Sequence, residues 1–160
     1  MILQFRDDRF HDWRVLNDSV MGGVSRSTFC FTVGGTGVFE GTVSLENNGG
    51  FASVRLPVIP LDLSAHTGLC IRHRGDGHRY RLRLHDNPRT DSIAYQADFR
   101  SHADWRETHL LFETFRPTFR GRVPTPAPAL DTGNIQQFGL MIADGQAGPF
   151  HLEVAHIHAY

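Results

Sequence analysis

The sequence of 160 residues contains no lysine, because all 16 of its basic residues are arginine. A coding bias explains this absence. The alternative is recognition of a ligand by planar guanidinium groups, which requires a specific arginine cluster. The formal net charge of -1 gives no general attraction to nucleic acid or to a membrane surface, so we expect neither partner.

Cysteines and long hydrophobic runs are also scarce. The two cysteines, Cys30 and Cys70, form no metal-binding motif and lie in apolar runs, so we expect buried free thiols rather than a disulfide. No apolar run approaches the roughly 18 residues that a membrane-spanning helix needs. The chain becomes charged at Arg6 without the apolar core of a secretory signal, so we expect a cytoplasmic protein without membrane insertion.

Helical periodicity is absent, and short runs of β-forming residues bounded by Gly, Pro, Asn or Asp take its place. Nine such runs occur, at residues 27–33, 37–45, 51–56, 68–74, 78–85, 92–99, 107–113, 136–143 and 149–160. They predict a single domain over residues 1–160, an all-β antiparallel β-sandwich of jelly-roll type. Between them we expect one short helical turn at 101–105 and a stiff, proline-rich surface crossing at 117–130.

Asp76 and Gly77 separate two of these runs, and Asp-Gly is a strong signal for a two-residue hairpin turn. The hairpin pairs Arg74 with Arg79 and Arg72 with Arg81. Its apolar face, which must point into the core, carries Leu69, Ile71, His73, Tyr80, Leu82 and Leu84. Its opposite face carries Cys70, Arg72, Arg74, Arg79, Arg81 and Arg83.

Like charges that face each other across two strands repel, so this arginine face requires compensation. One interpretation is a solvated outer face whose arginines pair with carboxylates such as Asp98 or Glu40. The other is a face that binds an external polar or anionic ligand. Ser53 and Arg55 share one face of their strand, and Arg55 would extend the same polar surface.

No motif for a serine hydrolase, a zinc protease, a P-loop or a dinucleotide site is present, and we predict no catalytic residue, metal site or cofactor. His156 and His158 share one strand face, as in some metal sites, but structural or solvated histidines are the favoured interpretation. Trp13 and Trp105 are either core residues at the ends of the sandwich or stacking platforms for a sugar ring.

The stretch VLNDSVMGGVS, residues 15–25, predicts a structured loop at one end of the sandwich. Asn17 and Asp18 would satisfy backbone groups of turns, and Met21 would fill the end of the core. Gly22 and Gly23 would permit positive φ or the close approach of another segment. The alternative places a set of polar and aromatic residues on the rim of a binding site: Trp13, Asn17, Asp18, Asp76 and Trp105.

Five stretches occur in order along the chain: WRVLNDSVMGGVSRS, FEGTVSLENNGGFASVR, RHRGDGHRYRLRL, FRPTFRGR and FGLMIADGQAGPFHLEV. Together they resemble the complex I intermediate-associated protein family, from about Phe5 to Ile157. The resemblance implies a galactose-binding-domain-like jelly roll, similar to non-catalytic carbohydrate-binding modules, and a non-enzymatic role. In mitochondria this family includes an assembly factor for NADH:ubiquinone oxidoreductase.

These observations lead to three hypotheses about function. The first is a binding or assembly module, chaperone-like and linked to respiratory complex assembly, that docks a protein partner through the arginine face. The second is a carbohydrate-binding module. The third is a sugar-active enzyme, which requires a deep pocket with convergent polar groups.

Overall fold

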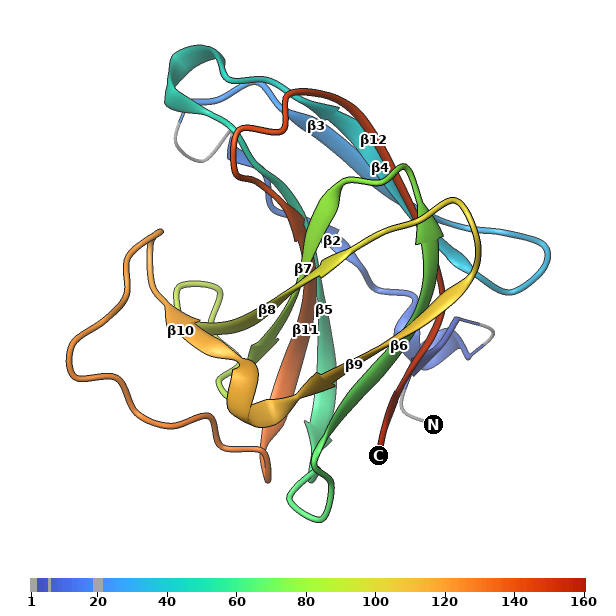
Figure 1. Ribbon diagram of the computed structural model, residues 1–160. Coiled ribbons are helices and arrows are strands. Elements are labelled where there is room, and N and C mark those ends of the chain that lie inside the picture. The colour runs from blue at the N-terminus through green and yellow to red at the C-terminus, as the bar shows by residue number, and fades with distance from the viewer. Residues whose placement is uncertain (1–2, 6, 19–21) are drawn as a thin grey trace.

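The computed structural model describes residues 3–5, 7–18 and 22–160, and these form strands, short 3-10 helices and loops (Figure 1). The elements follow one another in this order: β1 (Leu3–Gln4), η1 (Asp8–Phe10), β2 (Arg14–Val15), β3 (Arg26–Phe31), β4 (Gly37–Val43), η3 (Glu46–Asn48), β5 (Ala52–Leu61), β6 (Gly68–Gly75), β7 (Arg79–His85), β8 (Ala94–Arg100), β9 (Arg106–Leu111), η4 (Phe112–Thr114), β10 (Arg116–Thr118), β11 (Ile135–Ile142) and β12 (Gly148–Ala159).

The strands form two antiparallel sheets that enclose the core (Figure 1). The first sheet has the order β3-β4-β12-β6-β9, and β1 pairs with the C-terminal part of β12. The second sheet has the order β10-β8-β7-β11-β5-β2. The last strand of the chain, β12, lies between β4 and β6, so the middle of this sheet is formed by strands that are far apart in the sequence. This architecture is a jelly-roll β-sandwich, which confirms the predicted fold class.

Each of the nine predicted runs contains a strand. The sequence does not predict β1, β2 and β10, because two or three residues are too few to show an alternating pattern. The described residues contain no α-helix, and none of their helices is long and apolar enough to cross a membrane.

The two interruptions of the strand pattern have different outcomes. The predicted helical turn at 101–105 is wrong: residues 103 and 104 form a bend and the others are irregular. Ser101 is held in an extended connection because its hydroxyl donates to His78 O and accepts from Gly77 N, each at 3.0 Å. Residues 117–130 do cross the surface as largely irregular chain after the start of β10, as the prolines predict.

The predicted hairpin around Asp76 and Gly77 is also wrong, because its two strands belong to different sheets. In the first sheet, β6 pairs with β12 and β9; in the second, β7 pairs with β8 and β11. Both edges of both strands are therefore occupied by other partners. Residues 76–78 form an arch from one sheet to the other, and the local Asp-Gly signal does not distinguish an arch from a hairpin.

The burial predicted for these two strands is nevertheless confirmed. The six residues assigned to the core are each 0% exposed: Leu69, Ile71, His73, Tyr80, Leu82 and Leu84. They face one another across the sandwich rather than lying side by side. The arginines point away from the core as predicted, but they lie on two opposite outer surfaces: Arg72 and Arg74 on the first sheet, and Arg79, Arg81 and Arg83 on the second.

The cysteines agree only in part with the expectation of two buried thiols. Both are free, and Cys70 is buried at the centre of the first sheet. Cys30 is exposed, because β3 is an edge strand and its alternation turns Cys30 outward while Phe29 packs against the core. On an edge strand, only the side chains that point toward the core are buried, even when the whole run is apolar.

Candidate functional site

On the outer face of the first sheet, the arginines have partners from the chain itself. The Arg74 guanidinium lies 3.1 Å from Glu153 Oε2 and stacks over the Trp105 ring at 4.7 Å from its centroid. Arg72 approaches the same ring at 5.4 Å and is the register partner of Glu107. Trp105 is therefore a platform for arginine side chains. A cation over an aromatic ring is stabilised by the ring quadrupole.

On the outer face of the second sheet, register partners on all six strands form one continuous row. We call it the arginine row, and from β10 to β2 it consists of Arg116, Gln96, Arg83, Gly139, Arg55 and Arg14. Four of its six positions are arginine, and glycine lies at the centre between two of them. Because each pair is directly opposite, these side chains share one face of the sheet.

Arg83 and Arg55 are the partly buried arginines of this row, whereas Arg116 and Arg14 are exposed. Among the residues that the structure describes, no carboxylate forms an ion pair with Arg83 or Arg55. Burial, together with the charges of Arg55 and Arg81, lowers the pKa of Arg83 to about 10. Burial also lowers the pKa of Arg55. Both guanidinium groups remain charged at neutral pH, in a position where an anion would stabilise them.

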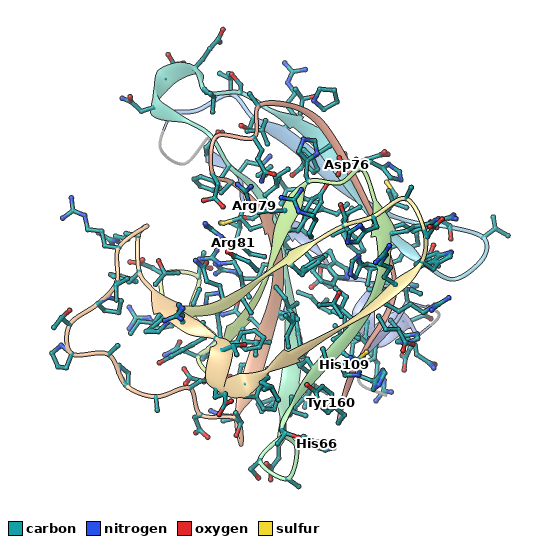
Figure 2. The ribbon with its side chains drawn as sticks, in the orientation of Figure 1. His66, Asp76, Arg79, Arg81, His109 and Tyr160 are labelled. Carbon is teal, nitrogen blue, oxygen red and sulfur yellow. The ribbon has the colours of Figure 1, made fainter. Side chains whose placement is uncertain are left out.

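The next arginine along β7, Arg81, is compensated within the chain. Figure 2 labels Arg81 beside Arg79, which lies two residues before it on β7. The Nη2 atom of Arg81 lies 2.6 Å from Asp144 Oδ1 and its Nε lies 3.3 Å from Asp98 Oδ1. The predicted pairing of the arginine face with Asp98 is therefore confirmed for Arg81. The other predicted carboxylate, Glu40, lies on the first sheet and pairs with His151 at 2.9 Å.

The loop of residues 86–93 borders the arginine row. Arg55 donates to Thr90 O at 2.7 Å, and Gln137 donates to Asn87 O at 2.6 Å. His85 lies beneath this loop with its Nδ1 3.0 Å from Ser92 Oγ, and burial, followed by the charges of Arg55 and Arg83, lowers its pKa to about 3. The loop therefore fixes one side of the face while a neutral histidine supports it.

Three buried polar atoms on this face have no hydrogen-bond partner among the described residues: Arg83 Nε, Gln96 Oε1 and His85 Nε2. Arg83 and Gln96 are adjacent in the arginine row, and His85 is two residues from Arg83 on the same strand. Buried polar groups are normally satisfied, so a local group of unsatisfied ones is an unusual feature of this face.

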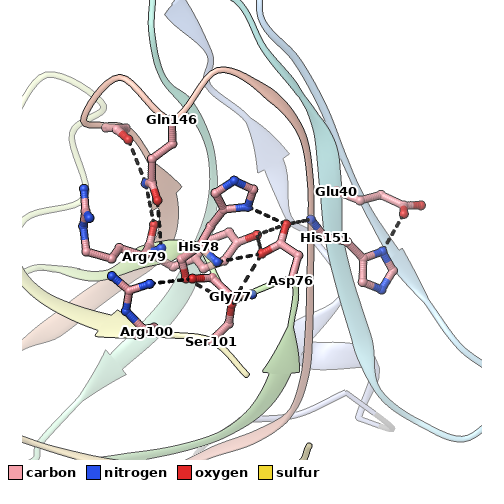
Figure 3. A network of polar contacts seen from close by, with 11 residues as sticks. Glu40, Asp76, Gly77, His78, Arg79, Arg100, Ser101, Gln146 and His151 are labelled. Atoms are coloured by element: carbon pink, nitrogen blue, oxygen red, sulfur yellow. Dashed lines mark hydrogen bonds and ion pairs between the residues drawn. The ribbon is translucent and has the colours of Figure 1, made fainter. Parts of the chain in front are cut away.

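The Asp76 carboxylate is occupied by hydrogen bonds from within the chain, as Figure 3 shows. Its carboxylate accepts hydrogen bonds from the backbone amides of His151 at 2.7 Å and His78 at 3.1 Å, and from the Tyr80 hydroxyl at 3.0 Å. Burial alone would raise its pKa, but these donors outweigh burial and lower it. The same contact and burial raise the pKa of Tyr80. Asp76 thus fastens the arch to both sheets.

Asn17 and Asp18 face inward, so neither forms a rim. The Asp18 side chain accepts from Ser25 Oγ at 2.5 Å and from the backbone amides of Ser25 and Gly50 at 3.0 and 2.8 Å. Burial would raise its pKa, but these donors lower it. Asn17 Oδ1 accepts from Ser53 N at 3.0 Å. The prediction that these residues satisfy backbone groups of turns is confirmed.

Gly23 and Gly49 pack against the Asp18 side chain. A Cβ on Gly23 would overlap the Asp18 carboxyl group, and a Cβ on Gly49 would lie 2.5 Å from Asp18 Oδ2. Gly22 has φ +86, as expected for a residue in the left-handed region. The predicted role of Met21 falls outside the described residues. Gly23 therefore reflects close packing around a buried carboxylate, and Gly22 reflects its positive φ.

Trp13 packs at the end of the core. Its ring stacks on Phe29 with centroids 4.4 Å apart, and its Nε1 donates to Phe10 O at 3.1 Å. Of the two interpretations offered for the tryptophans, core packing describes Trp13, whereas Trp105 lies beside arginines on the outer face of the first sheet.

His156 and His158 do share the outer face of β12, with ring centroids 5.4 Å apart. Within the described part of the chain, no group of three or more His, Cys, Asp or Glu side chains is arranged to hold a metal ion. Burial and the neighbouring His158 lower the pKa of His156.

Two of the grooves formed by the described residues can be compared with the position of the arginine row. One, of about 500 Å³, is lined by Phe119, Arg120, Arg122, Val123 and Pro124 in the loop after β10. The other, of about 440 Å³, lies beside the arch and includes Glu40, Asp76 and His151. The Asp76 carboxylate in the second groove is already occupied by the donors described above. The arginine row lies in neither groove.

The class of protein is defined by the sandwich and its exposed polar face: a jelly roll like those of carbohydrate-binding modules. The family 11 module of the cellulosomal cellulase Lic26A-Cel5E of Clostridium thermocellum superimposes with a TM-score of 0.74 at 14% identity, over 98% of this chain and 93% of that chain. A family 11 module from the same organism, in complex with a β-1,3-1,4-mixed-linked tetrasaccharide, gives 0.70 at 14% identity, over 92% of each chain. Identities this low show the shared fold alone.

The family is given by the sequence match. The model of complex I intermediate-associated protein 30 matches residues 3–154, so the chain belongs to that family, as the motifs predicted. An uncharacterized protein of Schizosaccharomyces pombe is 27% identical over 183 aligned residues, which cover 99% of this chain and 83% of that protein.

Sequence reasoning found part of the arginine row and missed the rest. It identified Arg55 and Arg83 but not Arg116, Arg14 or Gly139, which join them. Alternation along each strand indicates which side chains point outward. The order of strands in the sheet decides which of those side chains become neighbours, and the sequence carries no local signal for that order.

Proposed function

We propose that this chain is a non-catalytic binding module that docks a protein partner through the outer face of its second sheet. The observation that supports this proposal is the pair Arg83 and Arg55, which lies on either side of Gly139 without a carboxylate partner among the described residues. A partly buried charge without a partner costs free energy, and an acid supplied by another molecule offsets that cost.

Membership in the complex I intermediate-associated protein 30 family supports an assembly role for the docking. On this proposal, the partner is an intermediate or subunit of a respiratory complex that presents acidic residues. The chain would hold it in place without performing chemistry. The two grooves are separate from the arginine row, and we assign neither of them a part in the docking.

The test compares two double variants as bait in native lysate of the source organism, with captured proteins identified by mass spectrometry. Arg83→Glu with Arg55→Glu reverses the charge of the proposed face. Arg26→Glu with Arg106→Glu makes the same change in net charge at exposed arginines of β3 and β9, in the first sheet. We expect the first variant to lose partners that the second retains. If both capture the same proteins as the parent chain, the second sheet is not the docking face.

A carbohydrate-binding module is the alternative function, and the fold shared with a glucan-binding module favours it. One observation favours a protein partner over a carbohydrate. The described residues that point outward from the strands of the second sheet include no Phe, Tyr or Trp, so this face offers no aromatic platform for a sugar ring. Retention of the chain in an affinity gel that contains mixed-linked glucan would support the alternative.

A further inference from the structure

We infer that the ligand of the arginine row is an acidic peptide in a polyproline-like conformation, which crosses the strands and seats one carboxylate over Gly139 between Arg83 and Arg55. This inference rests on the proposed function, because it names the chemistry that the docking face recognises. Three observations support it: the spacing of the arginines, the glycine at the centre of the row and an unsatisfied acceptor beside Arg83.

The first observation is the even spacing of three arginines. Arg116 is on β10, Arg83 on β7 and Arg55 on β5, and one strand intervenes in each interval. Neighbouring strands lie about 4.8 Å apart, so successive arginines of this set start about 10 Å apart along the row. The Cα atoms of these three arginines therefore lie at a regular interval across the strands.

This interval matches one peptide conformation better than another. A polyproline-type chain has three residues per turn and a rise of about 3.1 Å, so every third side chain lies on the same side about 9 Å further along. A β-strand repeats its side chains every second residue, at about 6.7 Å. Acidic residues at every third position of a polyproline-type segment would therefore meet Arg116, Arg83 and Arg55 in turn.

The second observation is the glycine at the centre of the row. Glycine weakens the interior of a strand and often marks a place where a ligand approaches closely. A Cβ on Gly139 would make ordinary contacts, 3.4 Å from Arg83 Cβ and 3.4 Å from Val54 O, so the surrounding packing does not require glycine. Gly139 is buried between the two arginines, so a carboxylate would lie above it, flanked by two guanidinium groups, each of which can bind a carboxylate through two parallel hydrogen bonds.

The third observation is the unsatisfied acceptor between Arg116 and Arg83. Gln96 Oε1 is buried and receives no hydrogen bond from a described residue. If the Gln96 side chain rotates, this oxygen reaches the surface of the row, where backbone N–H groups of a peptide can donate to it and a carboxylate cannot. The same face carries no aromatic ring on its described strand residues, so a peptide fits its chemistry better than a sugar does.

The experiment titrates the full chain with synthetic peptides by isothermal calorimetry. The probe peptide repeats the tripeptide Glu-Pro-Ser, and its control has the same composition with all glutamates adjacent. We expect the periodic peptide to bind about tenfold more tightly than the control, because only it can place carboxylates at successive arginines. Equal affinity of the two peptides would overturn the spacing argument.

Variants of Gly139 test the central subsite without a change of charge. Gly139→Leu fills the space between the two arginines, and we expect it to weaken binding of the periodic peptide about tenfold. Gly139→Ala adds only a methyl group that fits the site, so its affinity should stay within about threefold of the parent chain. Thermal unfolding confirms that both variants are folded. Unchanged binding by Gly139→Leu would remove Gly139 from the site.

Two further outcomes separate this inference from the proposed function. If an oligogalacturonate binds more tightly than the periodic peptide, the ligand is an acidic glycan and the inference is wrong. If the periodic peptide does not bind while Arg83→Glu with Arg55→Glu still abolishes capture of the partner, the inference fails and the docking face stands. If that variant leaves capture unchanged as well, the proposed function fails.

Discussion

The outer faces of the two sheets both carry arginines, but the two faces differ in how these charges are compensated. On the first sheet, Arg74 has Glu153 and the ring of Trp105 beside it. On the second sheet, Arg83 and Arg55 have each other nearby and no ion-paired carboxylate among the described residues. The run of arginines from Arg72 to Arg83 is one continuous pattern in the sequence. Its division by the arch puts Arg74 beside a carboxylate on one face and leaves Arg83, on the other face, without an ion-paired carboxylate among the described residues.

The largest expected effect concerns the arch that separates the two faces. Asp76→Ala removes an acceptor shared by two backbone amides and the Tyr80 hydroxyl. We expect it to lower the free energy of unfolding by about 3 kcal/mol, because the buried donors then lack a partner. Urea denaturation measures this change. Asp98→Ala, at an exposed carboxylate of β8, is the control and should have little effect; equal losses would contradict the role of Asp76.

The next-largest effect is a pH dependence of the free energy of unfolding, to which one buried histidine in each sheet contributes. Burial, with His102 and Arg106 nearby, lowers the pKa of His73 in β6 to about 4, and burial lowers that of His85 in β7 to about 3. Both are neutral in the folded protein at pH 5, whereas the unfolded chain protonates them below about pH 6.5. The free energy of unfolding should therefore fall by about 2 kcal/mol from pH 6 to pH 5, continue to fall through pH 4 and level off below about pH 3.

Single variants assign this dependence to the two sheets. His73→Asn and His85→Asn should each remove about half of the fall, because each eliminates one titrating group. Urea denaturation at both pH values gives the slopes. A slope that neither substitution changes would show that other groups cause the acid sensitivity.

The smallest effect is also the sharpest comparison of the faces. Arg83→Met replaces a partly buried charge that has no carboxylate, and we expect the free energy of unfolding to rise by about 1 kcal/mol. Arg74→Met leaves Glu153 without its guanidinium partner, and the free energy should fall by about 1 kcal/mol. Thermal and urea unfolding of both variants measures the two signs. Equal signs would mean that the two faces do not differ in compensation.

Much of the fold is predictable because it depends on local alternation. The runs that become β6 and β7 alternate apolar and polar residues, and this fixes which side chains enter the core whatever strands lie beside them. The loop at 15–25 was likewise interpretable, because Asn17 and Asp18 make hydrogen bonds that such residues make in turns. Burial of both cysteines was not predictable, because exposure depends on whether a strand is at an edge.

The candidate site was predictable only in its residue types. Arg55 and Arg83 are visible as outward arginines, but their neighbours Gly139 and Arg116 come from distant parts of the chain. The expected pairs of Arg72 with Arg81 and Arg74 with Arg79 do not form, because a short Asp-Gly connection suits both a hairpin and an arch. Competition among all the strands for pairing partners decides between them, and no short stretch records that competition.

The sequence by itself determined the nine longer strands, their inward and outward faces, the jelly-roll class and the family. Each of these follows from local periodicity or from motifs that stay together along the chain. The tertiary structure alone decided that the arginines divide between two surfaces and that Arg116, Arg83, Gly139 and Arg55 lie in one row. The physical reason is that a strand's hydrogen-bonding edges are nearly the same for every sequence, so the choice of neighbour depends on the whole core.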